Sequence, residues 1–191
     1  MFHAYTLQIF GPFRFQIGDA PGRFPTKRGQ ALLSYLLLNN AQVHTRTALA
    51  EFLWPEQPEK KSRQNLRQTL TRMRQDLGVG LIHGDLLPLP DPFTTDYHTL
   101  QVDASLFAVD ALRFRAVLQS CAAHAHTAVD RCPHCAEQLR QALDLYQGEL
   151  LAGLSLEDSP AFESWLLMER EICHRQAVDA LQTVIAYHRA R

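Results

Sequence analysis

The chain of 191 residues lacks a long hydrophobic run. No stretch approaches the roughly 20 apolar residues that a membrane-spanning helix needs, so we expect no membrane association. The first residues, MFHAYTLQIF, also lack the basic start and apolar core of a secretory signal, which predicts a cytoplasmic protein. In that compartment cysteines are expected to be reduced thiols or metal ligands, and the chain has four: Cys121, Cys132, Cys135 and Cys173.

The sequence also lacks the motifs on which common enzymes depend. It has no glycine-rich phosphate loop, no nucleophile elbow and no clear pair of catalytic carboxylates. The adjacent acids Glu157 and Asp158 precede Ser159-Pro160, which is typical of a helix start, and acids near a helix N-terminus are favourable without any catalytic role. We therefore predict a protein that is not an enzyme.

Net charge is close to zero, but it is unevenly distributed along the chain. Residues 1–100 contain 11 Lys/Arg and 8 Asp/Glu, whereas residues 101–191 contain 8 and 12. A basic half followed by an acidic half indicates a polyanion-binding module joined to a module that does not bind polyanions.

The chain begins with strand-like patterns. Apolar and polar side chains alternate over residues 4–18, and Gly11-Pro12 interrupts the alternation, which predicts two short strands joined by a turn. A short third strand is expected at residues 23–25. These strands would form a small antiparallel sheet.

Two helices and a hairpin are expected in the rest of the first half. Thr26 suits the N-cap of a helix that begins near Lys27, and Thr45 suits the N-cap of a second helix. Trp54-Pro55 should end the second helix, because proline removes a donor and disfavours helical geometry in the residue before it. Residues 93–103 predict a β-hairpin.

The segment 59–78 predicts a basic amphipathic helix. It contains six Lys/Arg and two Asp/Glu, a net charge of +4. One face carries residues that recur at three- and four-residue steps, namely Ser62, Leu66, Thr69, Leu70, Met73 and Leu77. The other face is rich in the Arg, Gln and Thr side chains that contact bases and phosphates.

Two helices followed by a basic third helix and a hairpin predict a winged helix-turn-helix, in which the basic helix enters the major groove of double-stranded DNA and the hairpin is the wing. The side chains expected to contact base edges are Lys61, Gln64, Arg67, Gln68 and Thr71. Those expected to contact phosphates are Lys27, Arg28, Thr45, Arg46, Lys60, Arg63, Arg72 and Arg74.

The second half predicts helices only. They are expected at about 110–128, 134–149 and 160–188, the last beginning with the Ser159-Pro160 cap. The predicted fold is therefore an α+β winged helix-turn-helix domain over residues 1–104 followed by an all-α domain over residues 105–191.

Several segments resemble the Streptomyces antibiotic regulatory proteins. In the first half the similar segments are LQIFGPFRF at 7–15, KRGQALLSYLLL at 27–38, TRTALAEFLWP at 45–55 and SRQNLRQTLTRMRQDLG at 62–78. In the second half they are AVDALRF at 108–114, LRQALDLYQGELLAGL at 139–154 and FESWLLMEREICHRQAVDAL at 162–181. The first group resembles the OmpR-type winged-helix domain of that family, and the second resembles the start of its bacterial transcriptional activation domain.

The resemblance implies a transcriptional activator that binds direct repeats in DNA, often as a head-to-tail homodimer, and recruits RNA polymerase. It also implies that the helical half packs in a tetratricopeptide-like manner. Family activation domains usually run well beyond one long helix, so we expect further C-terminal domains of a larger parent protein after Arg191. Residues 79–92 depart from the family pattern.

A Cys/His cluster predicts a structural zinc site as an alternative to free thiols. Cys132 and Cys135 form a C-x2-C pair, and Cys121 with His124 precedes it, so these four could close a tetrahedral site. No other cofactor is expected. An alternative function also remains open, in which the protein is an interaction scaffold whose winged helix docks protein partners instead of DNA.

Overall fold

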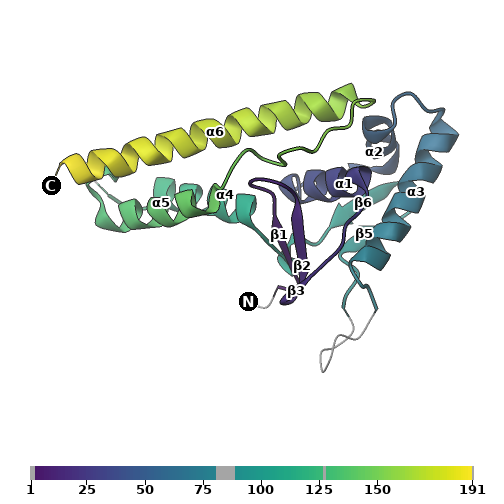
Figure 1. Cartoon of the computed structure of the whole chain (residues 1–191), viewed down its shortest axis with the longest axis horizontal. Coiled ribbons are helices and arrows are strands. Elements are labelled where there is room, and N and C mark those ends of the chain that lie inside the picture. Colours follow the sequence, from purple (N-terminus) through teal and green to yellow (C-terminus); the bar gives the residue numbers. More distant parts are fainter. Residues whose placement is uncertain (1–2, 81–88, 127, 191) are drawn as a thin grey trace. The chain divides into compact units, whose positions relative to one another are not determined.

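The computed structural model describes residues 3–80, 89–126 and 128–190 (Figure 1). Within these ranges no helix is both long enough and apolar enough to cross a membrane. The chain forms two compact units, of which the first comprises residues up to Leu7, Arg14–Ala108 and Gly153–Trp165. The second comprises Gln8–Phe13, Val109–Ala152 and residues from Leu166 onward. The predicted domain boundary at 104/105 remains a prediction.

A four-stranded sheet has the order β3-β2-β1-β7. Its strands are β1 (Tyr5–Gln8), β2 (Arg14–Ile17), β3 (Ala20–Pro21) and β7 (Phe107–Val109). The first two strands were predicted, but the third was placed wrongly at residues 23–25. Gly18, at φ 54°, allows a tight turn, so the chain returns at once and Ile17 pairs with Ala20. Phe24 instead buries its ring, 5.6 Å from that of Phe15.

Three helices follow, and the starts of the first two confirm the predicted caps. They are α1 (Lys27–Leu38), α2 (Arg46–Leu53) and α3 (Glu59–Asp76). The Thr26 hydroxyl accepts a hydrogen bond from the Gly29 N–H at 3.2 Å, and the Thr45 hydroxyl accepts one from the Ala48 N–H at 3.2 Å. These bonds satisfy donors that a helix start otherwise leaves unpaired.

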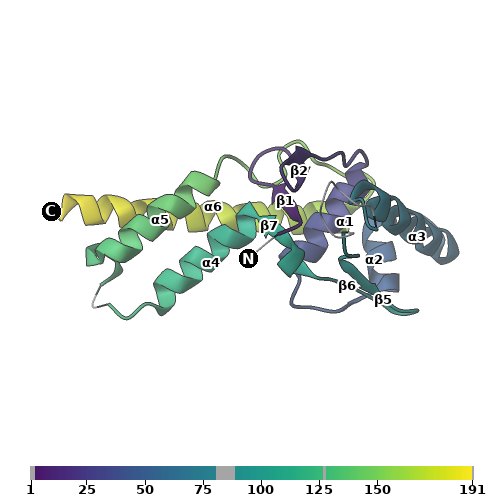
Figure 2. The ribbon, with the colours of Figure 1, turned by 90° about the horizontal axis from the view of Figure 1, so that it is seen from below.

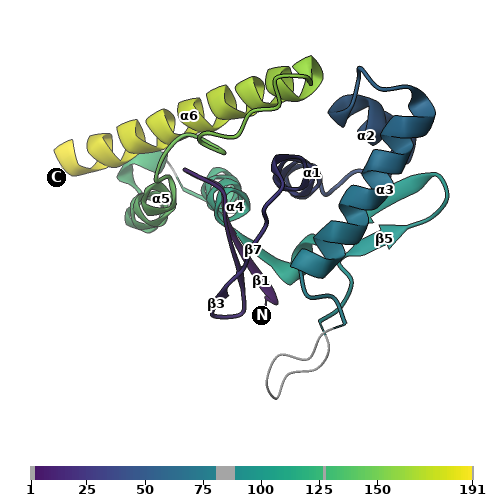
Figure 3. The same cartoon turned by 45° about the vertical axis from the view of Figure 1, so that its right-hand side comes forward.

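The predicted hairpin is present beside α3 (Figure 3). Its strands, β5 (Phe93–Thr95) and β6 (Thr99–Val102), form a second sheet with β4 (His44–Thr45), in the order β4-β6-β5. The strand β4 was not predicted. It exists because His44 and Thr45 pair with Leu100 and Thr99, which are far away in sequence.

The second unit is helical. Its helices α4 (Asp110–Ala123) and α5 (Pro133–Leu145) lie side by side and are joined through a short 3-10 turn, η2 (Val129–Arg131) (Figure 2). A further 3-10 turn, η1 (Ala104–Leu106), precedes β7 in the first unit. The long helix α6 (Pro160–Arg189) begins after Ser159, whose hydroxyl accepts from the Phe162 N–H at 3.4 Å, as predicted from Ser159-Pro160.

Both α4 and α5 end earlier than predicted. The backbone of His124 is extended, so α4 stops at Ala123 rather than near Ala128. After α5, the carbonyl of Glu149 accepts from the Gly11 N–H at 3.0 Å, and Leu150 forms a β-bridge with Phe10. The helix has already ended by then, because the Tyr146 N–H bonds the Leu143 carbonyl at 3.1 Å instead of a carbonyl four residues back.

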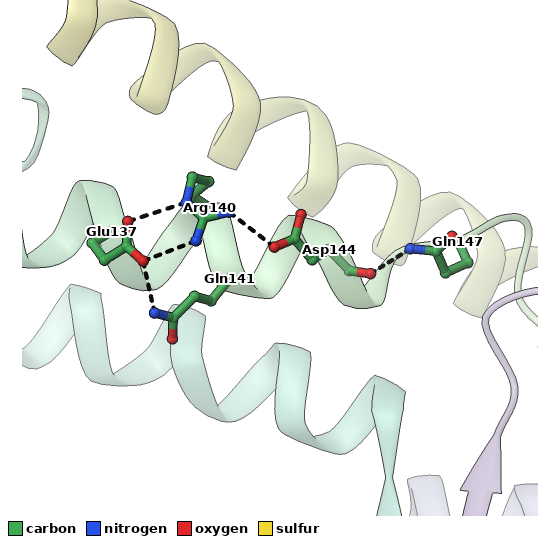
Figure 4. A network of polar contacts seen from close by, with 5 residues as sticks. All are labelled: Glu137, Arg140, Gln141, Asp144 and Gln147. Carbon is green, nitrogen blue, oxygen red and sulfur yellow. Dashed lines mark hydrogen bonds and ion pairs between the residues drawn. The ribbon is translucent and has the colours of Figure 1, made fainter.

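The outer face of α5 carries a chain of exposed polar contacts (Figure 4). Arg140 pairs with Glu137 at 2.9 Å and with Asp144 at 3.1 Å, and Gln141 donates to Glu137. The hydrogen bonds from Arg140 and then from Gln141 lower the pKa of Glu137 to about 2. The pairs follow the three- and four-residue spacing at which side chains meet on a helix surface.

Candidate nucleic-acid interface

The helix α3 has a buried face and an exposed face. Ser62, Leu66, Leu70 and Met73 are buried, so the apolar stripe predicted from the sequence orients the helix against the first unit. All five residues predicted to contact bases lie on the exposed face: Lys61, Gln64, Arg67, Gln68 and Thr71. The Thr71 hydroxyl donates to the Arg67 carbonyl at 3.1 Å, which leaves its lone pairs available.

The N-terminal half of α3 and the hairpin tip enclose a cavity of about 430 Å³. We call its basic side chains the basic patch, comprising Arg46, Lys60, Arg63 and Arg67. Of the described residues that line this cavity, four are basic and one, Asp96, is acidic. A concave surface of this charge attracts phosphate groups.

The hairpin tip is held in shape by Asp96. Its carboxylate accepts hydrogen bonds from the His98 N–H at 2.7 Å and from the backbone and hydroxyl of Thr99. The pKa of Asp96 is lowered mainly by the hydrogen bonds from Thr99, so the carboxylate stays ionised. The next residue, Tyr97, is 75% exposed and has the Arg63 guanidinium 5.7 Å from its ring centroid. Sequence reasoning did not single out Tyr97, because the proximity to Arg63 arises only in the folded chain.

The residues predicted to contact phosphates differ in how they are engaged. Among the residues that the structure describes, Lys27, Arg46, Lys60 and Arg72 make no ion pair. Arg63 approaches Glu59 at 3.5 Å on an exposed surface.

Arg28 and Arg74 are held by other groups of the first unit. Arg74 donates to Asp91 at 2.6 Å and lies 5.7 Å from the Phe93 ring centroid, at the base of the hairpin. Arg28 pairs with Asp158, donates to the Leu53 carbonyl at 3.2 Å and lies 5.4 Å from the Trp54 ring centroid. Neither partner acid is near in sequence, so composition alone could not show these pairs.

A second polar cavity, of about 630 Å³, lies on another side of α3. Its basic residues Lys27, Arg28 and Arg72 are accompanied by the acids Glu157 and Asp158, which sequence reasoning left without a role. The mixed charge makes this cavity a weaker attractor of phosphate than the basic patch.

The predicted zinc ligands lie at the facing ends of α4 and α5. The Nδ1 atom of His124 is 3.6 Å from Cys132 Sγ and 3.3 Å from Cys135 Sγ, whereas Cys121 Sγ points to the Cys135 carbonyl oxygen at 3.9 Å. Burial and the neighbouring thiols raise the pKa of Cys135 to about 12, while the backbone N–H of Cys135 lowers the pKa of Cys132. His126, which was not among the predicted ligands, has a ligand atom within 4.8 Å of those of His124 and Cys135.

The helical part of the chain is similar to a known protein family. Residues 109–190 match the family model of the bacterial transcriptional activator domain. The match begins at Val109, the last residue of β7, and takes in α4, α5 and all of α6.

A curated relative of this chain is the regulatory protein AfsR of Streptomyces coelicolor. The two are 29% identical over 196 residues, which cover 96% of this chain and 18% of AfsR. Together with the domain match, this similarity confirms the resemblance to the Streptomyces antibiotic regulatory proteins. That family consists of transcriptional regulators and not of enzymes.

A solved structure has the same fold. EmbR of Mycobacterium tuberculosis, in complex with a low-affinity phosphopeptide, superposes with a TM-score of 0.62 at 21% identity, covering 93% of this chain and 45% of that one. The α+β architecture, with a small N-terminal sheet followed by helices, is therefore shared. The chain spans less than half of either relative.

Proposed function

We propose that the chain is a sequence-specific DNA-binding transcriptional regulator, with a winged-helix domain over residues 1–104 and the start of a tetratricopeptide-like activation domain over residues 105–191. In this proposal α3 enters the major groove of double-stranded DNA and the β5–β6 hairpin is the wing. The match of residues 109–190 to an activator domain supports regulation of transcription as the overall role.

The observation that carries the proposal is the exposed face of α3. Its buried stripe leaves Lys61, Gln64, Arg67 and Gln68 accessible together. The major groove of B-DNA admits one α-helix, and these side chains have the donors and acceptors that distinguish base pairs there.

Base selection would depend on arginine and glutamine side chains of α3. Arg67 can donate two hydrogen bonds to the O6 and N7 atoms of guanine, and Gln64 or Gln68 can pair with the N6 and N7 atoms of adenine. Each such pair contributes about 1–3 kcal/mol of discrimination against a wrong base. Lys61 and Thr71 would complete the contacts along the same face.

Affinity would depend on phosphate contacts from the basic patch and its surroundings. Arg46, Lys60 and Arg63 line the cavity beside the hairpin tip, and Lys27 and Arg72 line the second cavity. Thr45 is exposed at the start of α2, where backbone N–H groups also favour an anion. In contrast, Arg28 and Arg74 would chiefly position the loops that their acidic partners belong to.

Regulation would follow from a second partner bound by the activator domain. We propose that two copies occupy direct repeats head to tail, and that the helical part then recruits RNA polymerase. On α6 the side chains of Leu167, Met168, Ile172, Leu181 and Ile185 are exposed. Exposed apolar groups of this kind are typical of surfaces that bind other proteins.

The proposal is tested by DNA binding of variants of α3. Arg67→Ala, and separately Gln64→Ala with Gln68→Ala, should weaken specific binding by about 1–3 kcal/mol for each lost base contact. Circular dichroism should show an unchanged fold, because all three residues are exposed. Gln75→Ala is the matched control, since Gln75 is an exposed glutamine of the same helix outside the predicted set. Unchanged affinity and selectivity in the Arg67 and glutamine variants would favour the protein-docking scaffold instead.

A further inference from the structure

The connection between α4 and α5 gathers four side chains that can bind a metal ion. His124 and His126 follow the last turn of α4, while Cys132 and Cys135 lie at the start of α5. These four residues follow the pattern H-x-H-x5-C-x2-C. The ligand set predicted from the sequence had Cys121 in place of His126.

The distances from His124 to the two cysteine sulfurs match those of a zinc site. Zinc in structural sites is tetrahedral, with bonds of about 2.3 Å to sulfur and about 2.0 Å to nitrogen, so a sulfur and a nitrogen ligand lie about 3.5 Å apart. The Nδ1 atom of His124 lies 3.3 Å from Cys135 Sγ and 3.6 Å from Cys132 Sγ. Ligand atoms of His124, His126 and Cys135 also lie within 4.8 Å of one another.

A hydrogen bond orients the His126 ring in the way that is usual for a metal-bound histidine. Its Nε2 atom lies 3.2 Å from the carbonyl oxygen of Cys121. A carbonyl only accepts, so Nε2 must carry the proton and Nδ1 keeps its lone pair. Histidines that bind metals usually donate their other ring N–H to a carbonyl or carboxylate in this way.

Cys121 is placed differently from the other cysteines of the cluster. It shares the buried apolar cluster of Leu139, Ala180 and Val184 with Cys135. However, the Cys121 sulfur faces the Cys135 carbonyl oxygen at 3.9 Å, whereas the Cys135 sulfur lies 3.3 Å from His124 Nδ1. Cys121 would then contribute to the site through its backbone carbonyl, which orients the His126 ring, and not through its thiol.

We propose that His124, His126, Cys132 and Cys135 bind one Zn²⁺ ion in a closed structural site. The ion binds the two cysteines as thiolates, so two protons are released on binding. Four protein ligands leave no open position for a substrate, which is typical of structural rather than catalytic zinc. The site would tie the end of α4 to the start of α5 and fix the extended connection between them.

The experiment measures zinc in the full chain, purified under reducing conditions without chelator. We expect about one zinc per chain by elemental analysis, and at least about tenfold weaker binding in His124→Ala, His126→Ala and Cys132→Ser, measured by competition with a chromophoric chelator. His134→Ala is the matched control, because His134 is an exposed neighbour whose ring centroid lies 5.0 Å from that of His124. Cys121→Ser should also keep its zinc.

A cobalt titration of the metal-free wild-type chain tests the site without relying on variants, whose folding the substitutions can impair. The expected spectrum is that of tetrahedral Co²⁺ with two thiolate ligands. Absence of zinc, a Cys132–Cys135 disulfide in the purified chain, or an octahedral cobalt spectrum would overturn the proposal. Loss of zinc in Cys121→Ser with retention in His126→Ala would overturn this ligand set.

Discussion

The ion pairs of the basic side chains predict how DNA binding responds to salt. Lys27, Arg46, Lys60 and Arg72 make no ion pair with any described residue, and Arg63 has only an exposed approach to Glu59. If these five neutralise five phosphates, the slope of log affinity against log salt is about −4.5, since each contact contributes about 0.9. Raising salt fourfold, from about 50 to about 200 mM, should then weaken binding about 500-fold.

Substitution of two of these residues should flatten the slope by a known amount. Lys60→Gln with Arg63→Gln removes two contacts, so the slope should become about −2.7 and the same salt increase should weaken binding only about 40-fold. Arg74→Gln should leave the slope unchanged, because Arg74 is already paired with Asp91 at 2.6 Å. It should instead lower stability by up to about 1 kcal/mol, the usual range for a surface pair.

Fluorescence anisotropy of a labelled duplex, measured at several salt concentrations, provides the slopes. Thermal unfolding of each variant shows whether the fold is intact. A wild-type slope in the double variant, or an Arg74→Gln slope as flat as that of the double variant, would contradict this prediction.

Three further predictions concern stability. Ser159→Ala should cost about 1–2 kcal/mol in thermal unfolding, because the buried hydroxyl donates to the Phe52 carbonyl and accepts from the Phe162 N–H. Leu66→Ala should cost about 2–5 kcal/mol in chemical denaturation, since Leu66 is fully buried beneath the exposed face of α3; a loss below about 1 kcal/mol would contradict that burial. Burial raises the pKa of Asp110 despite hydrogen bonds from Ile9 and Phe10, so the unfolded chain ionises this carboxyl first as pH rises. The stability of the wild type relative to Asp110→Asn should therefore fall with rising pH, and a rise would show that the backbone donors outweigh burial.

Local signals in the sequence predicted the helices well. Thr26, Thr45 and Ser159 each act as the expected N-cap, and Gly78 lies just past the end of α3 with φ 65°. A cap depends on side chains within a few residues, so it can be predicted from the adjacent sequence.

Elements that depend on distant partners were not predicted. The two-residue strand β4 exists through pairing with β6, and the segment after α5 forms a β-bridge with Phe10, which is far away in sequence. Such short pieces have no periodicity of their own. The ends of α4 and α5 were therefore predicted less well than their starts.

In the candidate interface, too, local features were predicted from the sequence and long-range contacts were not. The exposed face of α3 followed from its periodicity, and the structure places all five predicted base-contacting residues there. The engagement of Arg28 by Asp158 and of Arg74 by Asp91 depends on folding across 130 and 17 residues of sequence. Only the structure could therefore separate those two arginines from the other basic residues.

The central claim is that α3 selects DNA sequence through Arg67, Gln64 and Gln68. The most direct measurement is the selection of bound duplexes from a random pool at physiological salt, with the wild type and Arg67→Ala compared in parallel. We predict that the wild type enriches a direct repeat containing guanine and adenine positions, and that Arg67→Ala loses the preference at one guanine of each repeat. Enrichment of the same sequences by both proteins, or of none by the wild type, would contradict the claim.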